Sequence, residues 1–329
     1  MKPLAFHLAA FLREYLPGDR AYSAHTCDAY AYAFQLLLCF AAERYGSRPS
    51  ALSLEQLDAT LVLAFLEHIE TIRGNSARTR NARLAAIKAF AHFIEYRVPS
   101  AVEQVRCIGA IPFKKTDEVL VDYLNHQELQ ALLDAPEPTT HSGTRDCAML
   151  HVCFAAGLRV TELVCLRLDD VQTHPMTSIR IRGKGRRERI LPLWKETAKV
   201  LRAWTAIRPE TTAVEVFLNA RGDAMTRYGF EYILAKHVRT AAKVCPSIGS
   251  KHVSPHVLRH TCAMHTLQAT HDVRKVSLWL GHASVKSTEV YLRADPTAKL
   301  EALDAGVAPS LRRGKFKVPD RLLAMLRSE

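Results

Sequence analysis

Hydrophobic residues recur at helical spacing through the first hundred positions of the chain. In the segment 77–96, which Ser76 can cap, one helical face carries Leu84, Ile87, Phe90 and Ile94. Three further helices are expected before it: residues 4–16, residues 24–45 behind Ser23, and a third that follows a capping-box pattern at 53–56 and ends near Gly74. The pattern predicts a compact bundle of helices with basic residues outside its core.

The hydrophobic period changes in the second half of the chain. Residues 178–182 read Ser-Ile-Arg-Ile-Arg and alternate apolar with basic side chains, which is the period of a half-buried strand. Residues 183–186 supply a turn and residues 187–191 return, so we expect a β-hairpin. Around this hairpin, helices are expected over residues 145–156, 160–166, 194–207, 227–244, 272–280 and 284–293, and from Pro255 onward.

Between these two regions the periodicity weakens over 100–122, where Pro112 and Lys114-Lys115 interrupt it. The chain is 329 residues long, which is enough for two hydrophobic cores. We therefore expect an N-terminal helical domain over 1–107, a linker over 108–122, a mixed α/β domain over 123–308, and a tail with a last helix over 309–329. The fold class expected is mainly α with a small β-sheet or hairpin.

The net charge of the chain indicates which class of molecule it binds. Lys and Arg outnumber Asp and Glu by 45 to 33, a formal net charge of +12, and such a surface attracts polyanions. Nucleic acid is therefore the first partner to consider. No apolar run is long enough to cross a bilayer, and Met1-Lys2-Pro3-Leu4 does not open a secretory signal. We expect a cytoplasmic protein that does not bind a membrane.

The eight cysteines do not form a Cys-x-x-Cys pair, which argues against a zinc ribbon or a redox motif. Most lie within apolar helical segments. We expect most of the eight to be small buried side chains in a reducing compartment; they are Cys27, Cys39, Cys107, Cys147, Cys153, Cys165, Cys245 and Cys262.

Arg159 is the first residue with a specific chemical interpretation. It follows Gly157, which can end a helix, and it precedes Glu162 by three positions. A guanidinium can donate to two phosphate oxygens, and Glu162, one helical turn later, would orient it. Taken alone, this pattern is more often a helix start with a surface ion pair.

The expected hairpin concentrates positive charge. A charge run is usually a solvated face, but a two-stranded ribbon can enter a DNA groove. Lys184, at the Gly-Lys-Gly turn, could then reach a phosphodiester and protonate the leaving 5′ oxygen. The basic residues of the hairpin are Arg180, Arg182, Lys184, Arg186, Arg187 and Arg189.

His256 and Arg259 lie three positions apart on the helix that Ser254-Pro255 opens, and so share one face. The plain alternative is a satisfied core histidine beside a solvated arginine. His256 and His260 also have the i,i+4 spacing of metal ligands, but neither an acid nor a cysteine completes a recognisable set. We expect neither a metal nor another cofactor, and expect activity to persist in EDTA.

Tyr291 follows His282 by nine positions, and Gly281 can close a helix so that His282 stands at a turn. A tyrosine phenolate can attack a phosphodiester and conserve the bond energy in a phosphotyrosyl ester, so resealing needs no ATP. A lone tyrosine in this helix is usually a core residue. The order and spacing of all these groups favour a shared site instead.

Together, these residues resemble the active site of the tyrosine recombinases of the phage integrase family: Arg159, Lys184, His256, Arg259, His282 and Tyr291, with Glu162 behind them. The sequence resembles the family from about residue 120 to 300. Residues 23–30 and 79–84 look like the family's core-binding domain, which implies that the helical bundle binds DNA. Further DNA contacts are expected from Arg78, Arg80, Arg83, Arg180, Arg182, Arg186 and Arg187.

The resemblance implies a site-specific recombinase that cleaves and rejoins DNA through a 3′-phosphotyrosyl intermediate and a Holliday junction. Tyr291 would be the nucleophile, Lys184 the proton donor and His256 the general base or a hydrogen-bond donor, while Arg159, Arg259 and His282 would stabilise the transition state. The implied partners are double-stranded DNA with inverted binding sites, a homo-tetramer on that DNA, and accessory or sibling recombinases. Residues 284–303 look most like recombinases of transposons, which favours integration or transposition.

Three alternatives stay open. A Xer-type dimer resolvase and a type IB topoisomerase would use the same chemistry, and a non-catalytic DNA-binding protein could keep the fold without it. Intact active-site residues favour an enzyme. A requirement for two inverted sites and paired protomers would distinguish recombination from simple relaxation.

Overall fold

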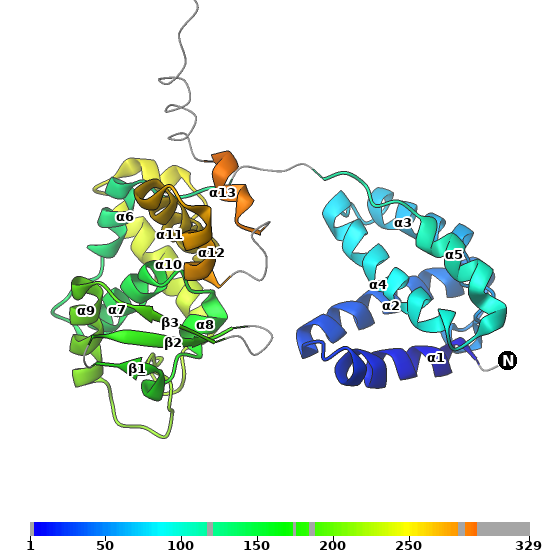
Figure 1. Cartoon of the computed structure of the whole chain (residues 1–329), viewed down its shortest axis with the longest axis horizontal. Coiled ribbons are helices and arrows are strands. Elements are labelled where there is room, and N and C mark those ends of the chain that lie inside the picture. The colour runs from blue at the N-terminus through cyan, green and yellow to red at the C-terminus, as the bar shows by residue number, and fades with distance from the viewer. Residues whose placement is uncertain (1–2, 117–120, 174–175, 184–187, 282–286, 295–329) are drawn as a thin grey trace, which may run out of the picture. The chain divides into compact units, whose positions relative to one another are not determined.

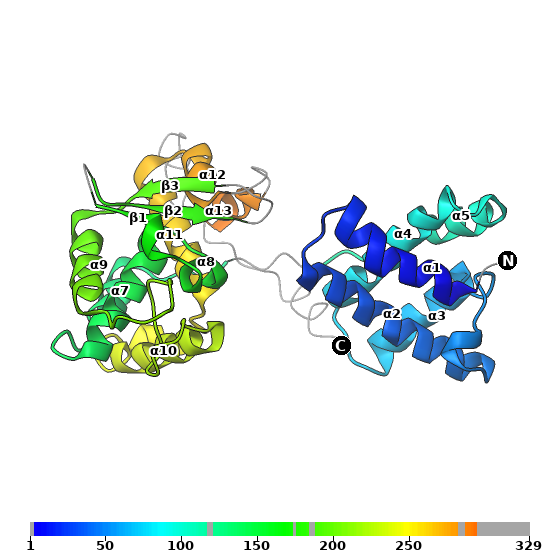
Figure 2. The ribbon, with the colours of Figure 1, turned by 90° about the horizontal axis from the view of Figure 1, so that it is seen from below.

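The computed structural model describes residues 3–116, 121–173, 176–183, 188–281 and 287–294. The chain divides into two compact units, Met1–Glu118 and Val119–Glu329. Each unit has its own hydrophobic core. Figures 1 and 2 show the helices of the first unit and the mixed helices and strands of the second.

The first unit is a bundle of helices around a core rich in phenylalanine, including Phe11, Phe34, Phe65, Phe90 and Phe93. Its α-helices are α1 (Leu4–Ala10), α2 (Ala24–Tyr45), α3 (Ala59–Thr71), α4 (Ala77–Glu95) and α5 (Val102–Ala110). Its other turns are the π-helix η1 (Phe11–Asp19) and the 3-10 helices η2 (Pro49–Ala51) and η3 (Pro99–Ala101).

Two of the expected helix starts are confirmed in this bundle. Ser23 caps α2 by accepting from the Thr26 amide, and Ser76 caps α4 by accepting from the Thr79 amide. Gly46 ends α2 in the left-handed conformation, at φ 59°. The polar cap and the glycine stop are local signals, so these ends could be located from sequence.

The first helix was expected to stop before Pro17, but the chain continues to Asp19 as η1. The amide of Arg20 donates to the carbonyl of Tyr15 at 2.9 Å, five residues back. A π-helical turn is wider than an α-helical one, and proline lacks the N–H that a regular turn would need. The wider turn therefore accommodates Pro17.

The expected capping box at 53–56 is wrong as the start of α3. The Ser53 amide bonds to the Gln56 side chain at 2.8 Å within a turn, and Asp58 caps the helix instead by accepting from the Leu61 amide at 2.7 Å. The Gln56 side chain thus satisfies the Ser53 amide locally before the helix begins.

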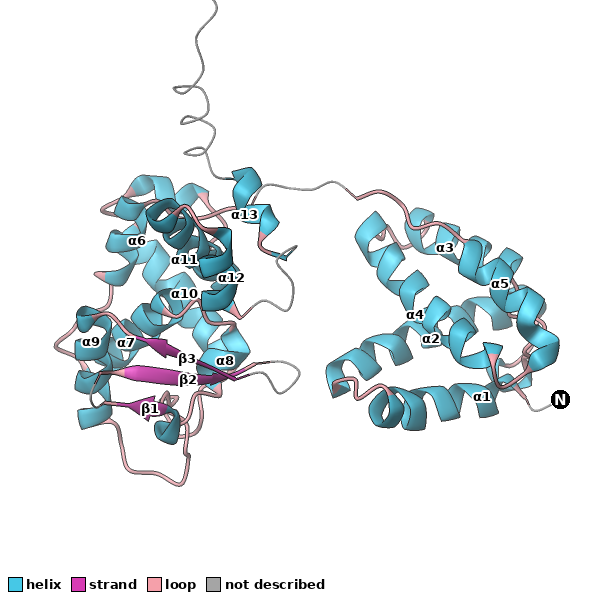
Figure 3. Cartoon of the chain, in the orientation of Figure 1, coloured by secondary structure: helices cyan, strands magenta, loops and turns pink. Residues whose placement is uncertain are grey.

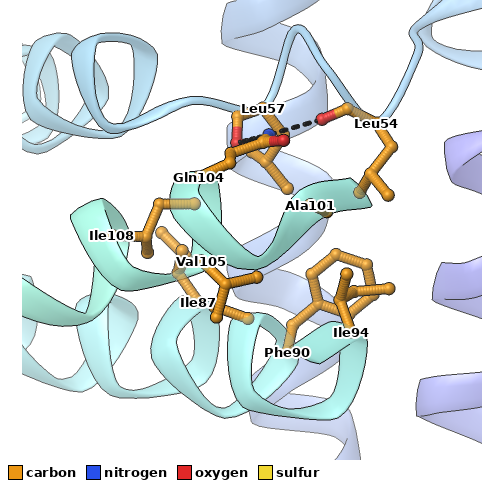
Figure 4. Close-up of a pocket in the computed structure, with 10 residues that line it drawn as sticks. Leu54, Leu57, Ile87, Phe90, Ile94, Ala101, Gln104, Val105 and Ile108 are labelled. Atoms are coloured by element: carbon orange, nitrogen blue, oxygen red, sulfur yellow. Dashed lines mark hydrogen bonds between the residues drawn. The ribbon is translucent and has the colours of Figure 1, made fainter. Parts of the chain in front are cut away.

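Helix α5 lies where weak periodicity suggested an irregular linker. Its buried residues Val105 and Ile108 pack into the bundle, and Gln104 donates to the carbonyls of Leu54 and Leu57 at 2.6 Å each (Figure 4). A nine-residue helix with two buried positions leaves little hydrophobic pattern to detect. Because α5 runs to Ala110, the first unit extends past residue 107, while the exact domain bounds stay a prediction.

Arg80 does not lie outside the core of the bundle, although its basic residues were expected there. It is 5% exposed, and it donates to the Pro112 carbonyl at 3.1 Å and lies 3.6 Å from a Glu70 oxygen. This arginine anchors the chain that leaves α5 and its guanidinium is bonded within the bundle, while the DNA contact expected of Arg80 stays a prediction. Arg78 is exposed, and Arg83 is half-buried with its guanidinium 4.8 Å from the ring of Tyr32.

The second unit combines helices with one small sheet (Figure 3). Its α-helices are α6 (His126–Leu133), α7 (His141–Ala155), α8 (Val160–Val164), α9 (Lys195–Ile207), α10 (Arg227–Ala241), α11 (Pro255–Thr270), α12 (Val273–Leu280) and α13 (Glu289–Ala294). Its 3-10 helices are η4 (Leu168–Asp170) and η5 (Pro246–Ser250), and its strands are β1 (Val171–Gln172), β2 (Ser178–Arg182) and β3 (Glu188–Pro192).

The sheet confirms the expected hairpin strands and adds a short third strand. The order is β1-β2-β3, both pairs are antiparallel, and Ile181 pairs with Arg189. Ile179 and Ile181 are buried while Arg182 is exposed, as the alternation predicted. The two-residue strand β1 is too short to produce a period of its own.

Several helices of this unit begin at polar caps. Ser254 caps α11, as the sequence indicated, while Asn125 forms a capping box with Glu128 and Asp272 caps α12. Helix α7 begins earlier than expected because Thr140 caps it, and the chain turns after it at Gly157, with φ 55°. The core includes Trp204, whose indole N–H donates to the Val216 carbonyl at 2.8 Å.

The expectation for most of the cysteines is wrong. Only Cys153 and Cys262 are buried, while Cys39, Cys107 and Cys165 are exposed and the other three are intermediate. An apolar neighbourhood in sequence does not say which side of a helix a cysteine occupies. All eight are free thiols.

Across the described residues, every helix falls short of the length and apolar character needed to span a bilayer.

Candidate active site

Helix α11 contributes three polar side chains to the candidate site. The Ser254 hydroxyl accepts from the Val257 amide at 3.4 Å, and Pro255 fills the first turn, where its missing N–H costs nothing. This start leaves His256 exposed at the beginning of the helix and buries Arg259 to 4% exposure. His260, next in the chain, is half-buried.

Arg259 joins the ends of two other helices. Its guanidinium donates to the carbonyl of Gly157, just after α7, and to that of Leu280, the last residue of α12, at 2.8 Å in the second case. Carbonyls at helix C-termini carry partial negative charge, which favours a cation there. Burial, together with the charge of Arg159, lowers the pKa of Arg259 to about 10, so the guanidinium stays charged at neutral pH.

Glu162 is a carboxylate among three guanidinium groups. Arg159 donates to it at 2.8 Å, Arg189 donates twice at 3.2 and 3.0 Å, and Arg259 lies 3.8 Å away. Burial by itself raises the pKa of Glu162, but the bond from Arg189 and the surrounding positive charge outweigh it and hold the pKa below its usual value. One negative charge against three positive ones leaves this pocket cationic.

Tyr291 lies on α13 and is 2% exposed. Its hydroxyl is 3.0 Å from Nδ1 of His260, and the two rings meet edge to face with centroids 5.6 Å apart. Burial raises the pKa of Tyr291 to about 12, although the positive charge of Arg259 opposes the shift. The phenol is therefore protonated at neutral pH in the free protein.

His260 is the neutral partner in this pair. Burial lowers its pKa to about 4, with smaller contributions in the same direction from the nearby His256 and Arg259. At neutral pH the imidazole is uncharged and can take part in one donated and one accepted hydrogen bond.

The structure brings together three of the six residues singled out in the sequence. Arg159 and Arg259 share Glu162, and the charges of both act on Tyr291. His256 is close enough for its charge to act on His260, the partner of Tyr291. Lys184 and His282 lie outside the described residues, as do Arg186 and Arg187.

The two remaining hairpin arginines are placed differently from each other. Arg180 is half-buried on β2. Arg182 is exposed and is 2.9 Å from Asp170 and 3.8 Å from Glu188. Arg182 is therefore partly neutralised by its neighbours.

Two residues of this site, Arg189 and His260, were not predicted from the sequence to belong to it. Arg189 reads in the sequence only as hairpin charge, yet it pairs with the buried Ile181 and is held by Glu162. The strand alternation could have placed it, because residues paired across a sheet share a face. The spacing of His260 suggested only a metal ligand. No group of three His, Cys, Asp or Glu residues suited to a metal occurs within the described parts of the chain.

Comparison with known proteins identifies the family. Residues 122–298 match the Phage integrase family, and residues 8–97 match the Phage integrase, N-terminal SAM-like domain. The chain belongs to the phage integrase family. The first match covers all of the cationic pocket and Tyr291, and the second covers the helical bundle from within α1 through α4.

The relatives agree with this assignment. The chain is 39% identical over 325 residues to y4rC of Sinorhizobium fredii, whose name proposes an integrase/recombinase, and the match covers 99% of this chain and 98% of that protein. It is 32% identical over 305 residues to the tyrosine recombinase XerC of Pelobacter propionicus, covering 92% and 96%. These matches confirm the expected enzyme class, a tyrosine recombinase that carries out site-specific DNA recombination.

Solved structures share the fold. The integrase of the transposon Tn1549 superposes with a TM-score of 0.67 at 15% identity, covering 93% of this chain and 100% of that one. The XerH site-specific recombinase superposes with a TM-score of 0.65 at 22% identity, covering 87% and 81%. Both agree with the mainly helical fold and small sheet expected from sequence.

Proposed function

We propose that this recombinase cuts duplex DNA by attack of the Tyr291 hydroxyl on a phosphodiester. The new bond joins Oη to phosphorus, the bond from phosphorus to the 5′ oxygen breaks, and a 3′-phosphotyrosyl link remains. The observation that supports this most strongly is the position of the Tyr291 hydroxyl, 3.0 Å from Nδ1 of His260, which follows Arg259 of the cationic pocket on α11. A cationic pocket beside a hydroxyl nucleophile suits a phosphate whose negative charge grows during attack.

The two arginines are suited to different tasks. Arg259 is fixed by two backbone carbonyls and is nearly buried, so its charge is preorganised. Arg159 keeps 38% of its side chain exposed and can donate to an incoming phosphate. Glu162, itself bonded to Arg189, accepts from Arg159 and holds it in place from behind.

The remaining roles rest on the sequence resemblance. His256, exposed at the start of α11, is proposed as the general base. Lys184 is proposed to protonate the leaving 5′ oxygen, and His282 to help stabilise the transition state. DNA contacts are proposed for Arg78, Arg80, Arg83, Arg180, Arg182, Arg186 and Arg187.

We further propose that the chain works as a tetramer on two duplexes with inverted binding sites. Solved proteins of this fold include XerH bound to a palindromic substrate and a lambda integrase tetramer bound to a Holliday junction. A mobile-element recombinase is favoured by the y4rC relative, with its proposed integrase/recombinase name. Dimer resolution is the second candidate, because XerC is also a relative.

Replacement of Tyr291 by phenylalanine tests the nucleophile. The Tyr291→Phe protein should bind DNA fragments from its element's ends as the parent does, yet form no covalent protein–DNA adduct on a denaturing gel, in buffer containing EDTA. Removing one buried hydroxyl leaves the phosphate-binding arginines untouched, so only the chemical step should be lost.

Tyr96→Phe is the matched control, because Tyr96 is 60% exposed in the other unit and its loss of the same atom should leave adduct formation intact. Adducts that persist in Tyr291→Phe would show that another residue is the nucleophile. Cleavage that EDTA abolishes would show that a metal takes part.

A further inference from the structure

The hydrogen bond between His260 and Tyr291 has no task in the function proposed so far. It joins Nδ1 of a half-buried imidazole on α11 to the hydroxyl of a tyrosine on α13, at 3.0 Å. The two rings also pack edge to face. Both partners lie where an isolated polar atom would be costly, so the bond fixes the phenol strongly.

The chemistry of the pair excludes one role and favours another. Both groups are neutral at neutral pH in the free protein, and His260 is a much weaker base than the phenolate it would have to generate. His260 is thus poorly suited to remove the phenolic proton. It is well suited to accept that proton in a hydrogen bond, with its own hydrogen on Nε2.

The position of His260 adds a geometric reason. It follows Arg259 directly, so the imidazole that holds the nucleophile and the guanidinium whose charge is proposed to stabilise the phosphate belong to one continuous helix. A rigid element that carries both keeps their separation constant. In-line attack depends on that separation, because small misplacements of a reacting atom lower rates strongly.

We propose that His260 is a positioning residue that holds the Tyr291 hydroxyl at a fixed place relative to Arg259. Nδ1 accepts the phenolic hydrogen before attack. When the bond from Oη to phosphorus forms, that proton leaves to the general base, for which His256 is the proposed group. This inference rests on the proposed function of Tyr291 and adds the residue that aligns it.

Two substitutions of nearly equal size separate positioning from simple packing. The amide oxygen of asparagine stands close to the place of Nδ1, whereas that of glutamine reaches the place of Nε2. His260→Asn should therefore retain most of the adduct-forming rate, while His260→Gln and His260→Ala should lose about tenfold to hundredfold. DNA affinity should stay unchanged in all three.

His265→Ala is the matched control on the same helix. His265 is also half-buried and bonds to the Leu124 carbonyl at 2.9 Å, but it lies outside the proposed machinery. Its loss should lower the melting temperature without slowing adduct formation in the remaining folded protein. Single-turnover rates are measured at saturating DNA for every variant, with melting temperatures alongside.

A substrate with sulfur in place of the bridging 5′ oxygen identifies the step affected. A thiolate leaves without a proton, so the defect of a missing proton donor is relieved, whereas a badly placed nucleophile stays slow. The His260→Gln defect should persist on this substrate, and that of Lys184→Ala should shrink.

The inference is overturned if His260→Ala or His260→Gln forms adducts at the parental rate, if asparagine rescues no better than glutamine, or if the sulfur substrate restores the rate. Adducts that survive in Tyr291→Phe would instead reject the proposed nucleophile, and this inference with it. The His260 variants therefore test the positioning role, and the Tyr291→Phe variant separately tests the nucleophile.

Discussion

At the scale of single residues, this molecule places several ionised groups inside its cores and pairs each of them. Asp146 is 1% exposed and lies 2.9 Å from Nε2 of His237 and 2.7 Å from the guanidinium of Arg145. Burial alone raises the pKa of Asp146, but these partners outweigh it and hold the pKa below the usual value. The carboxylate form is therefore favoured by the folded state.

Asp146→Asn should lower the free energy of unfolding at pH 7 by about 3–5 kcal/mol, because it removes one member of a buried ion pair. The aspartate pKa is lower in the folded than in the unfolded chain. Its contribution is therefore complete above the unfolded value, near 4, and disappears as pH falls through the folded value. Calorimetry from pH 7 to pH 3 should show the parent and the variant converging.

Glu103→Gln is the control for this prediction. Glu103 and Arg106 form a pair of similar length, 2.9 Å, on an exposed helix surface, so its removal should change the melting temperature little. Equal effects of the two substitutions would contradict the importance of burial.

Some residues of the candidate site could be predicted from the sequence alone, and others could not. Arg159, Arg259 and Tyr291 could be named from motif spacing, and the structure gathers them around one pocket. The contact of His260 with Tyr291 could not be predicted from sequence, because it joins residues on two different helices, 31 positions apart in the chain. Spacing within a helix is local, whereas packing between helices is set by the whole core.

At the scale of elements, the closest packing near the site occurs at Gly157. Its backbone is left-handed, at φ 55°, and a Cβ atom there would stand 2.5 Å from a methyl carbon of Leu280 and 3.1 Å from the sulfur of Cys262. The same residue offers its carbonyl to Arg259. The end of α7 therefore fits against α11 and α12 only without a side chain.

Gly157→Ala should destabilise the second unit by about 2–5 kcal/mol, the sum of left-handed strain and overpacking. The shift of α7 should also move the Gly157 carbonyl away from Arg259, so adduct formation should slow more than DNA binding weakens. Melting temperature and single-turnover rate measure the two effects.

Gly46→Ala isolates the backbone contribution. Gly46 has nearly the same conformation, at φ 59°, but open space where the Cβ would go. Gly46→Ala should lower the free energy of unfolding by about 1–2 kcal/mol, from the left-handed strain alone. If the Gly157→Ala protein were as stable as Gly46→Ala, α12 would be able to move aside for the added Cβ atom, and the predicted overpacking would be contradicted.

Elements with strong local signals were predictable, and those without were missed. Caps at Ser23, Ser76 and Ser254 located three helices to within a residue or so. Helix α5 has two buried positions, and β1 has two residues in all, so neither leaves a periodic pattern. The helix end predicted at Pro17 was wrong because a π-helical segment, which has no recognisable sequence signal, continues past this proline.

At the scale of the whole molecule, positive charge is the dominant feature, with 45 basic against 33 acidic residues. If DNA binding rests on many phosphate contacts, it releases counterions. Affinity for duplex should then fall by about 10³–10⁵ between about 50 and 200 mM salt. Equilibrium binding at four or five salt concentrations gives the slope of log affinity against log salt. A flat profile would contradict an extended phosphate interface.

The division into two units with separate cores also has an optical consequence. All three tryptophans, Trp194, Trp204 and Trp279, belong to the second unit, where Trp204 is buried and Trp194 is 55% exposed. The helical bundle of the first unit contains no indole at all. Indole fluorescence therefore reports directly on the half that carries Tyr291, so a shift of its emission with denaturant would follow that half without any attached dye.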